Sequence, residues 1–127
     1  MDFREVQNEG ANQIKGYGPG ELRINDDRYT EPLVVMPESL WQGWLPIRAG
    51  ELETAHLEPL VEETIEVLLI GTGDRLVFPE PALTAPLINQ GIGVEAMDTP
   101  AACRTFNILM SEDRKVAAAL FLTEEAG

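Results

Sequence analysis

The chain is poor in cysteine, histidine and long apolar runs, and each shortage excludes a class of protein. Its single cysteine, Cys103, leaves no internal disulfide and no cysteine-rich zinc site. Its single histidine, His56, has no partner motif around it and is expected on the surface of a short helix. No apolar run approaches the roughly 20 residues that a helix needs to cross a bilayer. Membrane insertion is therefore not expected.

Basic residues are scarce beside acidic ones. Of 127 residues, 9 are Lys or Arg and 22 are Asp or Glu, so the formal net charge is -13. A polyanion would be repelled over most of such a surface, which argues against nucleic acid or an anionic membrane as a partner. The acids form no tail, so the charge indicates solubility. Residues 1–10 lack the apolar core of a secretory signal, and a cytoplasmic location is the default expectation.

Nucleotide-binding motifs are also missing, although one loop invites that interpretation. Val67–Ile70 is an apolar run that leads directly into Gly71, Thr72 and Gly73, which indicates a strand buried on both faces and then a turn. A dinucleotide fingerprint would need glycine where Leu76 stands and a helix at once. The Gly-Lys-Ser/Thr end of a Walker loop is absent as well. The sequence therefore favours a structural turn.

The pattern changes at this strand, from hairpins before it to alternating helices and strands after it. We expect one α/β domain of the layered type: N-terminal β-hairpins followed by two β-α-β units that form a mixed sheet with helices packed on it. The domain is expected over residues 13–123, after a flexible N-terminal arm over residues 1–12, which are polar and aperiodic. Residues 124–127 are expected to be a loose C-terminus.

The first half predicts short strands. Glu21–Asn25 alternates polar and apolar residues, and the turn residues Asn25, Asp26 and Asp27 follow. The next strand, over residues 28–36, should be interrupted at Pro32, which lacks a ladder donor.

Two tryptophans occupy the segment that follows. Trp41 and Trp44 are expected to pin their loop to the core, with a tryptophan-lined ligand pocket as the alternative. A further short strand is expected over residues 44–47.

The second half predicts helices between buried strands. A helix capped by Thr54 should be short or distorted because of Pro59, and one over residues 81–90 should bend at Pro86. A strand over residues 92–96 leads to a helix capped by Thr99 that runs to about Met110. Residues 116–122 are apolar at every position, as in a central parallel strand, although three alanines leave a helix as the alternative.

One candidate site follows from this topology. If the two β-α-β units are parallel, the loop of Gly71, Thr72 and Gly73 and the loop of Asp98 and Thr99 lie at the same sheet edge, where open α/β sheets bind ligands. Arg104 and Asn107, one and two turns into the next helix, would add hydrogen-bond donors to this ligand or partner cleft. The negative charge of Asp98 would repel an anionic ligand. Helix capping is an alternative explanation for these residues that needs no ligand.

Catalytic chemistry has no comparable support. Cys103 lies near the start of the same helix, whose dipole would lower a thiol pKa, but a nucleophile needs a base and His56 is far away in sequence. We expect a buried structural cysteine. No catalytic residue, no metal site and no cofactor is expected.

Four blocks of the second half resemble one family of small domains: residues 66–73, 91–99, 101–109 and 114–120, together with residues 17–20 and Trp44. This family includes mitochondrial complex I assembly factor three, the adipogenesis-associated domain protein and many bacterial proteins. The resemblance spans about residues 14–122. Pro86, inside a helix, departs from the family pattern, and the absence of a transit sequence agrees with a bacterial cytoplasmic member.

The resemblance implies a mixed-sheet α/β domain without agreed catalytic residues, and a role in assembling a respiratory complex through protein contacts. We therefore expect a non-enzymatic protein-binding or assembly module whose partner is a respiratory complex subunit or an assembly protein. The alternative is a small-molecule-binding protein or an undescribed enzyme that uses the Gly71 and Asp98 loops. The oligomeric state does not follow from the sequence.

Overall fold

The computed structural model describes residues 3–7 and 10–124 and contains two β-sheets. In chain order, its elements are β1 (Arg4–Gln7), β2 (Ile14–Gly18), β3 (Glu21–Ile24), β4 (Asp27–Tyr29), β5 (Leu33–Val35), β6 (Ser39–Gln42), the 3-10 helix η1 (Ala49–Glu51), α1 (Thr54–Leu57), the 3-10 helix η2 (Glu58–Glu63), β7 (Val67–Gly71), α2 (Pro81–Ile88), β8 (Gly93–Met97), α3 (Thr99–Ser111) and β9 (Val116–Leu120). No helix among the described residues is both long and apolar enough to cross a membrane.

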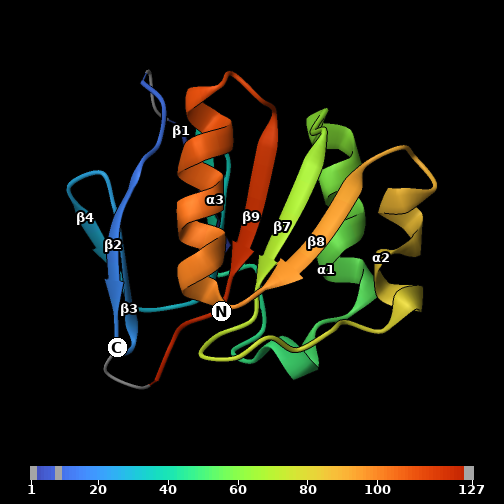
Figure 1. Cartoon of the computed structure of the whole chain (residues 1–127), viewed down its shortest axis with the longest axis horizontal. Helices are drawn as coiled ribbons and strands as arrows, with labels where there is room; N and C mark the ends of the chain where they lie inside the picture. Colours follow the sequence, from blue (N-terminus) through green and yellow to red (C-terminus); the bar gives the residue numbers. More distant parts are fainter. Residues whose placement is uncertain (1–2, 8–9, 125–127) are drawn as a thin grey trace.

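The larger sheet is mixed and has six strands in the order β1-β6-β5-β9-β7-β8. Strands β7, β8 and β9 run parallel, and β5 joins them antiparallel to β9. The smaller sheet, β2-β3-β4, is antiparallel and lies beside α3 (Figure 1). The expected combination of N-terminal hairpins, two β-α-β units and a mixed sheet is therefore confirmed.

The central strands are apolar at every position because both faces of the sheet are covered. On one face, Leu68 and Ile70 of β7 join the residues of α1, η2 and α2 in a buried cluster. On the other, Val67 and Leu69 pack with α3 and with Leu22 of the smaller sheet. Alternate side chains of β9 divide between the same two clusters, which confirms the strand interpretation of residues 116–120.

The two crossover connections place their helices on opposite faces. The chain passes from β7 through α2 to its neighbour β8, and then returns through α3 to β9 on the other side of β7. Crossovers of the same hand that step in opposite directions along a sheet put their helices on opposite sides. Figure 1 shows α3 to the left of strands β9, β7 and β8, with α1 and α2 to their right.

Proline distorts the first helix as expected, whereas the bend expected at Pro86 of the second helix stays a prediction. Only Thr54–Leu57 is α-helical in the first, which continues from Glu58 as the 3-10 helix η2 that contains Pro59. Helix α2 contains Pro86. The expected caps were one residue too late, since Glu53 and Asp98 hold the N-cap positions instead of Thr54 and Thr99.

The strand expected over residues 44–47 is wrong, and strand β6 lies earlier, at Ser39–Gln42. There Trp41 pairs with Val34 of β5, and its ring packs edge-to-face on Trp44, 5.9 Å away. Trp44 donates from Nε1 to the carbonyl of His56, at 2.9 Å. The tryptophans therefore hold their loop against the first helix, as expected.

Part of the expected flexible arm is a strand. β1 pairs antiparallel with β6, and Phe3 packs against Trp41 and Trp44 at 5.8 and 5.4 Å between ring centroids. A polar segment can do this because strand pairing uses the backbone. Residues 1–2 and 8–9 of this arm, and 125–127 of the expected loose C-terminus, lie outside the described residues. The bounds of the expected domain stay a prediction.

Candidate functional site

The Gly71 and Asp98 loops meet at the carboxyl ends of β7 and β8. In the parallel register, Gly71 lies opposite Met97. The amide of Thr72 donates to the carbonyl of Met97 at 2.9 Å, and the amide of Thr99 donates to the carbonyl of Gly73 at 2.9 Å. The two loops are thus tied together by backbone hydrogen bonds, in the juxtaposition that the topology predicts.

Thr99 joins three segments at this point. Its hydroxyl accepts from the amide of Gly73 at 2.8 Å and donates to the carbonyl of Phe121 at 2.6 Å. Thr99 is completely buried. Because both backbone groups are away from water, this one hydroxyl satisfies a donor and an acceptor that would otherwise be costly to bury. Thr99 therefore connects the end of β7, the start of α3 and the residue that follows β9.

The remaining groups of these loops also have internal partners. The Thr72 hydroxyl donates to the carbonyl of Arg75 at 2.6 Å and accepts from the amide of Val77 at 3.0 Å. Asp98 caps α3 by accepting from the amide of Ala101 at 2.8 Å. These contacts give each residue a structural role, and a ligand bound at these loops stays a prediction.

Gly71 lets α3 approach the sheet closely. A Cβ at this position would lie 3.0 Å from the Ala102 Cβ, 3.0 Å from the Leu120 Cδ2 and 3.1 Å from the Thr99 Cα. Two of these neighbours belong to α3, and one of the two is backbone, so a rotamer change cannot relieve the contact. The glycine is required by packing here.

We expect Gly71→Ala to lower the free energy of unfolding by about 1–3 kcal/mol, because overpacking must push α3 away from β7. Urea denaturation measures this loss. Gly93→Ala is the matched control in the same sheet, since its Cβ would meet nothing closer than 3.8 Å. Equal stability of the two variants would contradict the packing role of Gly71.

Asn107 and Arg104 take no part in the hydrogen bonds that join the Gly71 and Asp98 loops. Asn107 pairs with the edge of β2: its Oδ1 accepts from the amide of Ile14 at 2.9 Å, and its Nδ2 donates to the carbonyl of Ile14 at 2.8 Å. This amide joins the smaller sheet to α3. Arg104 is exposed on the helix surface.

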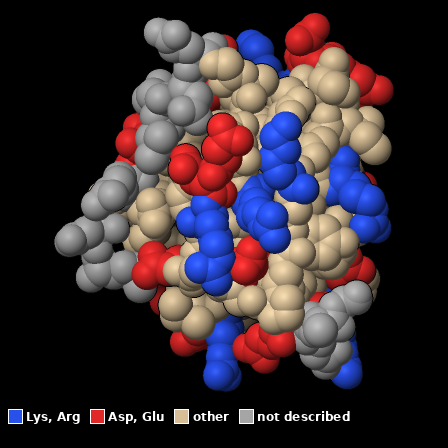
Figure 2. All heavy atoms as spheres, turned by 90° about the vertical axis from the view of Figure 1, so that its left-hand side faces the viewer, with Lys and Arg blue, Asp and Glu red and all other residues tan. Residues whose placement is uncertain are grey.

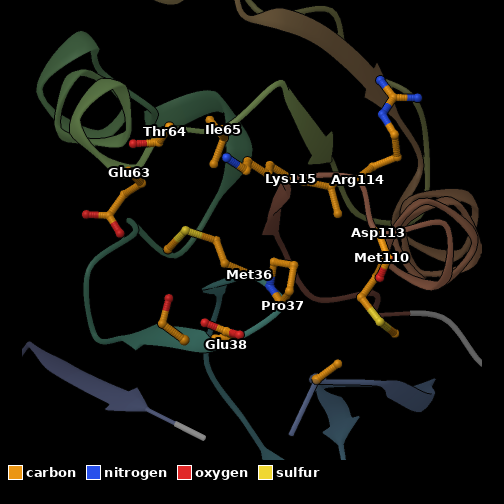
Figure 3. Close-up of a pocket in the computed structure, with 13 residues that line it drawn as sticks. Met36, Pro37, Glu38, Glu63, Thr64, Ile65, Met110, Asp113, Arg114 and Lys115 are labelled. Carbon is orange, nitrogen blue, oxygen red and sulfur yellow. The ribbon is translucent and has the colours of Figure 1, made fainter. Parts of the chain in front are cut away.

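Two cavities lie at opposite ends of the parallel strands. One, of about 200 Å³, includes Thr72 and Val77 and is bounded by η1 and the start of α2. The larger, of about 570 Å³, lies at the opposite end of the parallel strands, and its rim carries acids such as Glu63 and the bases Arg114 and Lys115. Figure 3 shows the Arg114 side chain directed away from the cavity centre, and its Nε lies 2.7 Å from the Glu66 Oε2.

The larger cavity has one carboxyl group in an unfavourable setting. Partial burial, and secondarily the charge of Glu5, raise the pKa of Glu63 above its ordinary value. A raised pKa means that the folded chain binds this proton more tightly than the unfolded chain, so ionisation costs stability above the folded pKa. We expect Glu63→Gln to raise the melting temperature slightly at pH 7 and to leave it unchanged at a pH where the carboxyl is protonated. If Glu63→Gln raised the melting temperature only at acid pH, the expected direction of the pKa effect would be contradicted.

Cys103 is a buried structural thiol, as expected. It is 3% exposed, and burial raises its pKa to about 12, more than offsetting the opposite effect of Arg104. We expect Cys103 to react slowly with a thiol reagent at pH 8 in the folded chain and rapidly in urea. Equal rates in the two states would contradict its burial. Among the described residues, no cluster of His, Cys, Asp and Glu is arranged to hold a metal ion.

The sequence did not indicate one prominent surface feature. Residues 76–78 form a loop on which Leu76, Val77 and Phe78 are 45%, 49% and 79% exposed. Ile47, 58% exposed, lies two residues before η1, which borders the same small cavity as Phe78. We call these four residues the apolar surface. Its only signal in the sequence was a run of large apolar residues bounded by Arg75 and Pro79.

The family model described as "Protein of unknown function (DUF498/DUF598)" matches residues 14–121. NADH dehydrogenase [ubiquinone] 1 alpha subcomplex assembly factor 3 of Xenopus tropicalis is 37% identical over 108 residues, which are 84% of this chain and 59% of that protein. The chain therefore spans about three-fifths of this relative's length. The resemblance to an assembly-factor family, noted from the sequence blocks, is confirmed.

Solved structures share the fold. A crystal structure of a Bordetella parapertussis protein is 38% identical with a TM-score of 0.83, covering 89% of this chain and 97% of that one. An outer membrane protein from Bartonella henselae is 34% identical with a TM-score of 0.73, covering 91% and 98%. By the family match and by these identities, the chain belongs to the DUF498/DUF598 family, which also includes complex I assembly factor 3.

Proposed function

We propose that this chain is a non-enzymatic module that binds a protein partner through its apolar surface during assembly of a respiratory complex. The observation that carries the proposal is Phe78, whose side chain is 79% exposed. Exposed apolar side chains of this size, gathered at one place, are typical of interaction sites. Aromatic residues are also over-represented in the central contacts of protein interfaces.

The loop that carries Leu76, Val77 and Phe78 is fixed by hydrogen bonds. Thr72 bonds both the Arg75 carbonyl and the Val77 amide, and the Asp74 carboxylate accepts from the amide of Glu124 at 2.9 Å. A loop fixed in this way loses little conformational entropy when a partner binds. The cavity of about 200 Å³ beside Phe78 is lined in part by Leu52 and Leu83, which suits an apolar side chain of the partner.

The assembly role is supported by the relatives. The Xenopus tropicalis protein is by name an assembly factor for NADH dehydrogenase. We therefore infer that the partner is a subunit or another assembly protein of a respiratory complex.

Affinity capture from an extract of the native organism tests this function. The tagged chain should recover one protein in stoichiometric amount, and a Phe78→Asp variant with the same melting temperature should recover none. Repeated failure of the unmodified chain to recover any stoichiometric protein would contradict a binding function. Capture that is equally strong with both chains would place the interface elsewhere.

A membrane surface is a second candidate for the same surface. One relative is named an outer membrane protein, and Arg48 and Arg75 flank the apolar residues, as in segments that lie in a bilayer interface. The exposed acids Glu51 and Glu80 nearby oppose an anionic bilayer. Flotation with phosphatidylglycerol vesicles separates the two: a chain that floats only when Phe78 is present binds the membrane instead.

A further inference from the structure

A second surface, on the smaller sheet, carries much of the chain's limited positive charge. Lys15 of β2, Arg23 of β3 and Arg28 of β4 are all exposed, in a chain with 9 basic residues and a net charge of -13. Figure 2 shows Lys and Arg side chains gathered over this side of the molecule. We call these three residues with Glu21 the basic face. It shares no residue with the apolar surface, and the inference from it does not depend on the proposed function.

Two arginines of the basic face are held by one carboxylate. The Arg28 Nε lies 3.0 Å from one oxygen of Glu21, and the Arg23 Nε lies 3.2 Å from the other. Both arginines lower the pKa of Glu21, with Arg28 contributing more. Each guanidinium group uses its Nε in this contact, so its two terminal nitrogens remain for a further acceptor.

Around Glu21 itself the positive side chains outnumber the negative ones, while the exposed acids Asp26 and Asp27 lie where β3 turns into β4. Two guanidinium groups face one carboxylate, and Lys15 adds another cation. The Arg23 and Arg28 side chains are 66% and 62% exposed. A carboxylate from outside would complete the pairing of two arginines that Glu21 has already oriented, which reduces the entropy lost on binding.

The segment of β2 beside these arginines contains two glycines, which have no side chains. Gly16 lies opposite Arg23 and Gly18 lies opposite Glu21 in the register of β2 with β3. A Cβ on Gly16 would have open space around it, and one on Gly18 would meet only the Glu21 side chain. The outer face of β2 therefore offers a strip without side chains along which an extended chain can lie next to the two arginines.

The overall charge selects the kind of partner. A bilayer or a nucleic acid presents an extended polyanion that would also face the acidic remainder of the chain and be repelled. A short acidic segment contacts the basic face locally and avoids this cost. A small free anion would bind weakly, because isolated ion pairs in water contribute little. We propose that the basic face binds an extended acidic segment of a protein, through the guanidinium groups of Arg23 and Arg28.

Fluorescence anisotropy with a labelled peptide of eight alternating Asp and Glu residues tests this proposal on the full chain at low salt. We expect saturable binding that weakens as salt is raised. The double variant R23Q/R28Q should bind at least tenfold more weakly. The matched control is R48Q/R75Q, which changes the net charge equally on a different surface and should stay within twofold of the unmodified chain. Melting temperatures of both variants check that they are folded.

Several results would overturn the proposal. Equal weakening by the two double variants would mean that only net charge matters. Binding of the corresponding Asn/Gln peptide with the same affinity would exclude recognition of carboxylates, and no binding of the acidic peptide at low salt would exclude the site. Sedimentation with phosphatidylglycerol vesicles that depends on Arg23 and Arg28, without peptide binding, would assign the basic face to a membrane.

Discussion

Replacing Thr99 with valine is expected to lower the free energy of unfolding by about 2–4 kcal/mol, because two buried backbone groups lose their partner at once. Valine has nearly the same shape, so packing is retained while the Gly73 amide and the Phe121 carbonyl are left unpaired. Thr99 is 0% exposed, which prevents water from replacing the hydroxyl without rearrangement. Urea denaturation of the purified variant measures the loss.

Thr105→Val is the control for this prediction. Thr105 is a partly buried threonine on the same helix, and it lies outside the junction of the two loops. Its replacement should change stability by less than about 0.5 kcal/mol, as substitutions away from specific contacts usually do. If Thr99→Val is no more destabilising than this control, the hydroxyl does not hold the loops together.

Phe78→Ala is expected to weaken partner binding on the order of 30-fold or more, which corresponds to about 2 kcal/mol for an interface hot spot. The expectation rests on the exposure of this ring beside an apolar cavity. Since the ring contacts little of the chain itself, the free energy of unfolding should change by less than about 0.5 kcal/mol. Titration calorimetry with the captured partner gives the affinity, and urea denaturation gives the stability.

Ile108→Ala removes an equally apolar side chain from another surface. Ile108 is 57% exposed on α3. Its variant should retain the affinity of the unmodified chain. Loss of binding in the Ile108 variant together with full binding by the Phe78 variant would move the interface from the apolar surface to α3.

The central strands could be predicted because their environment leaves a clear pattern. β7 and β9 are buried on both faces, so every position is apolar, and the glycine loop marks where β7 ends. β6 could not be recognised in the same way, because Ser39–Gln42 is short, follows Pro37 and carries polar residues at both ends. β1 is held by backbone pairing and by Phe3, and neither leaves a periodic signal.

The position of the candidate site was predictable, but its internal hydrogen bonds were not. Parallel strands end at one edge, which placed the Gly71 and Asp98 loops together. That Thr99 would bond to Phe121 depends on how β9 leaves the sheet, a contact between residues 22 positions apart. The exposure of Phe78 was hidden for a different reason, since a large apolar residue ordinarily indicates burial.

The most direct test of binding through the apolar surface is amide hydrogen exchange of the chain, alone and in complex with the captured partner. We expect new protection at the amides of Arg75, Leu76, Phe78 and Glu80, and at those of Ile47, Ala49 and Gly50. Pro79 has no amide hydrogen, and the amides of Val77 and Arg48 already donate to Thr72 and Glu51. The amides of Gly73 and Thr99, already bonded internally, should change little. Protection that is absent from residues 75–80 while the complex is intact would contradict the proposed interface.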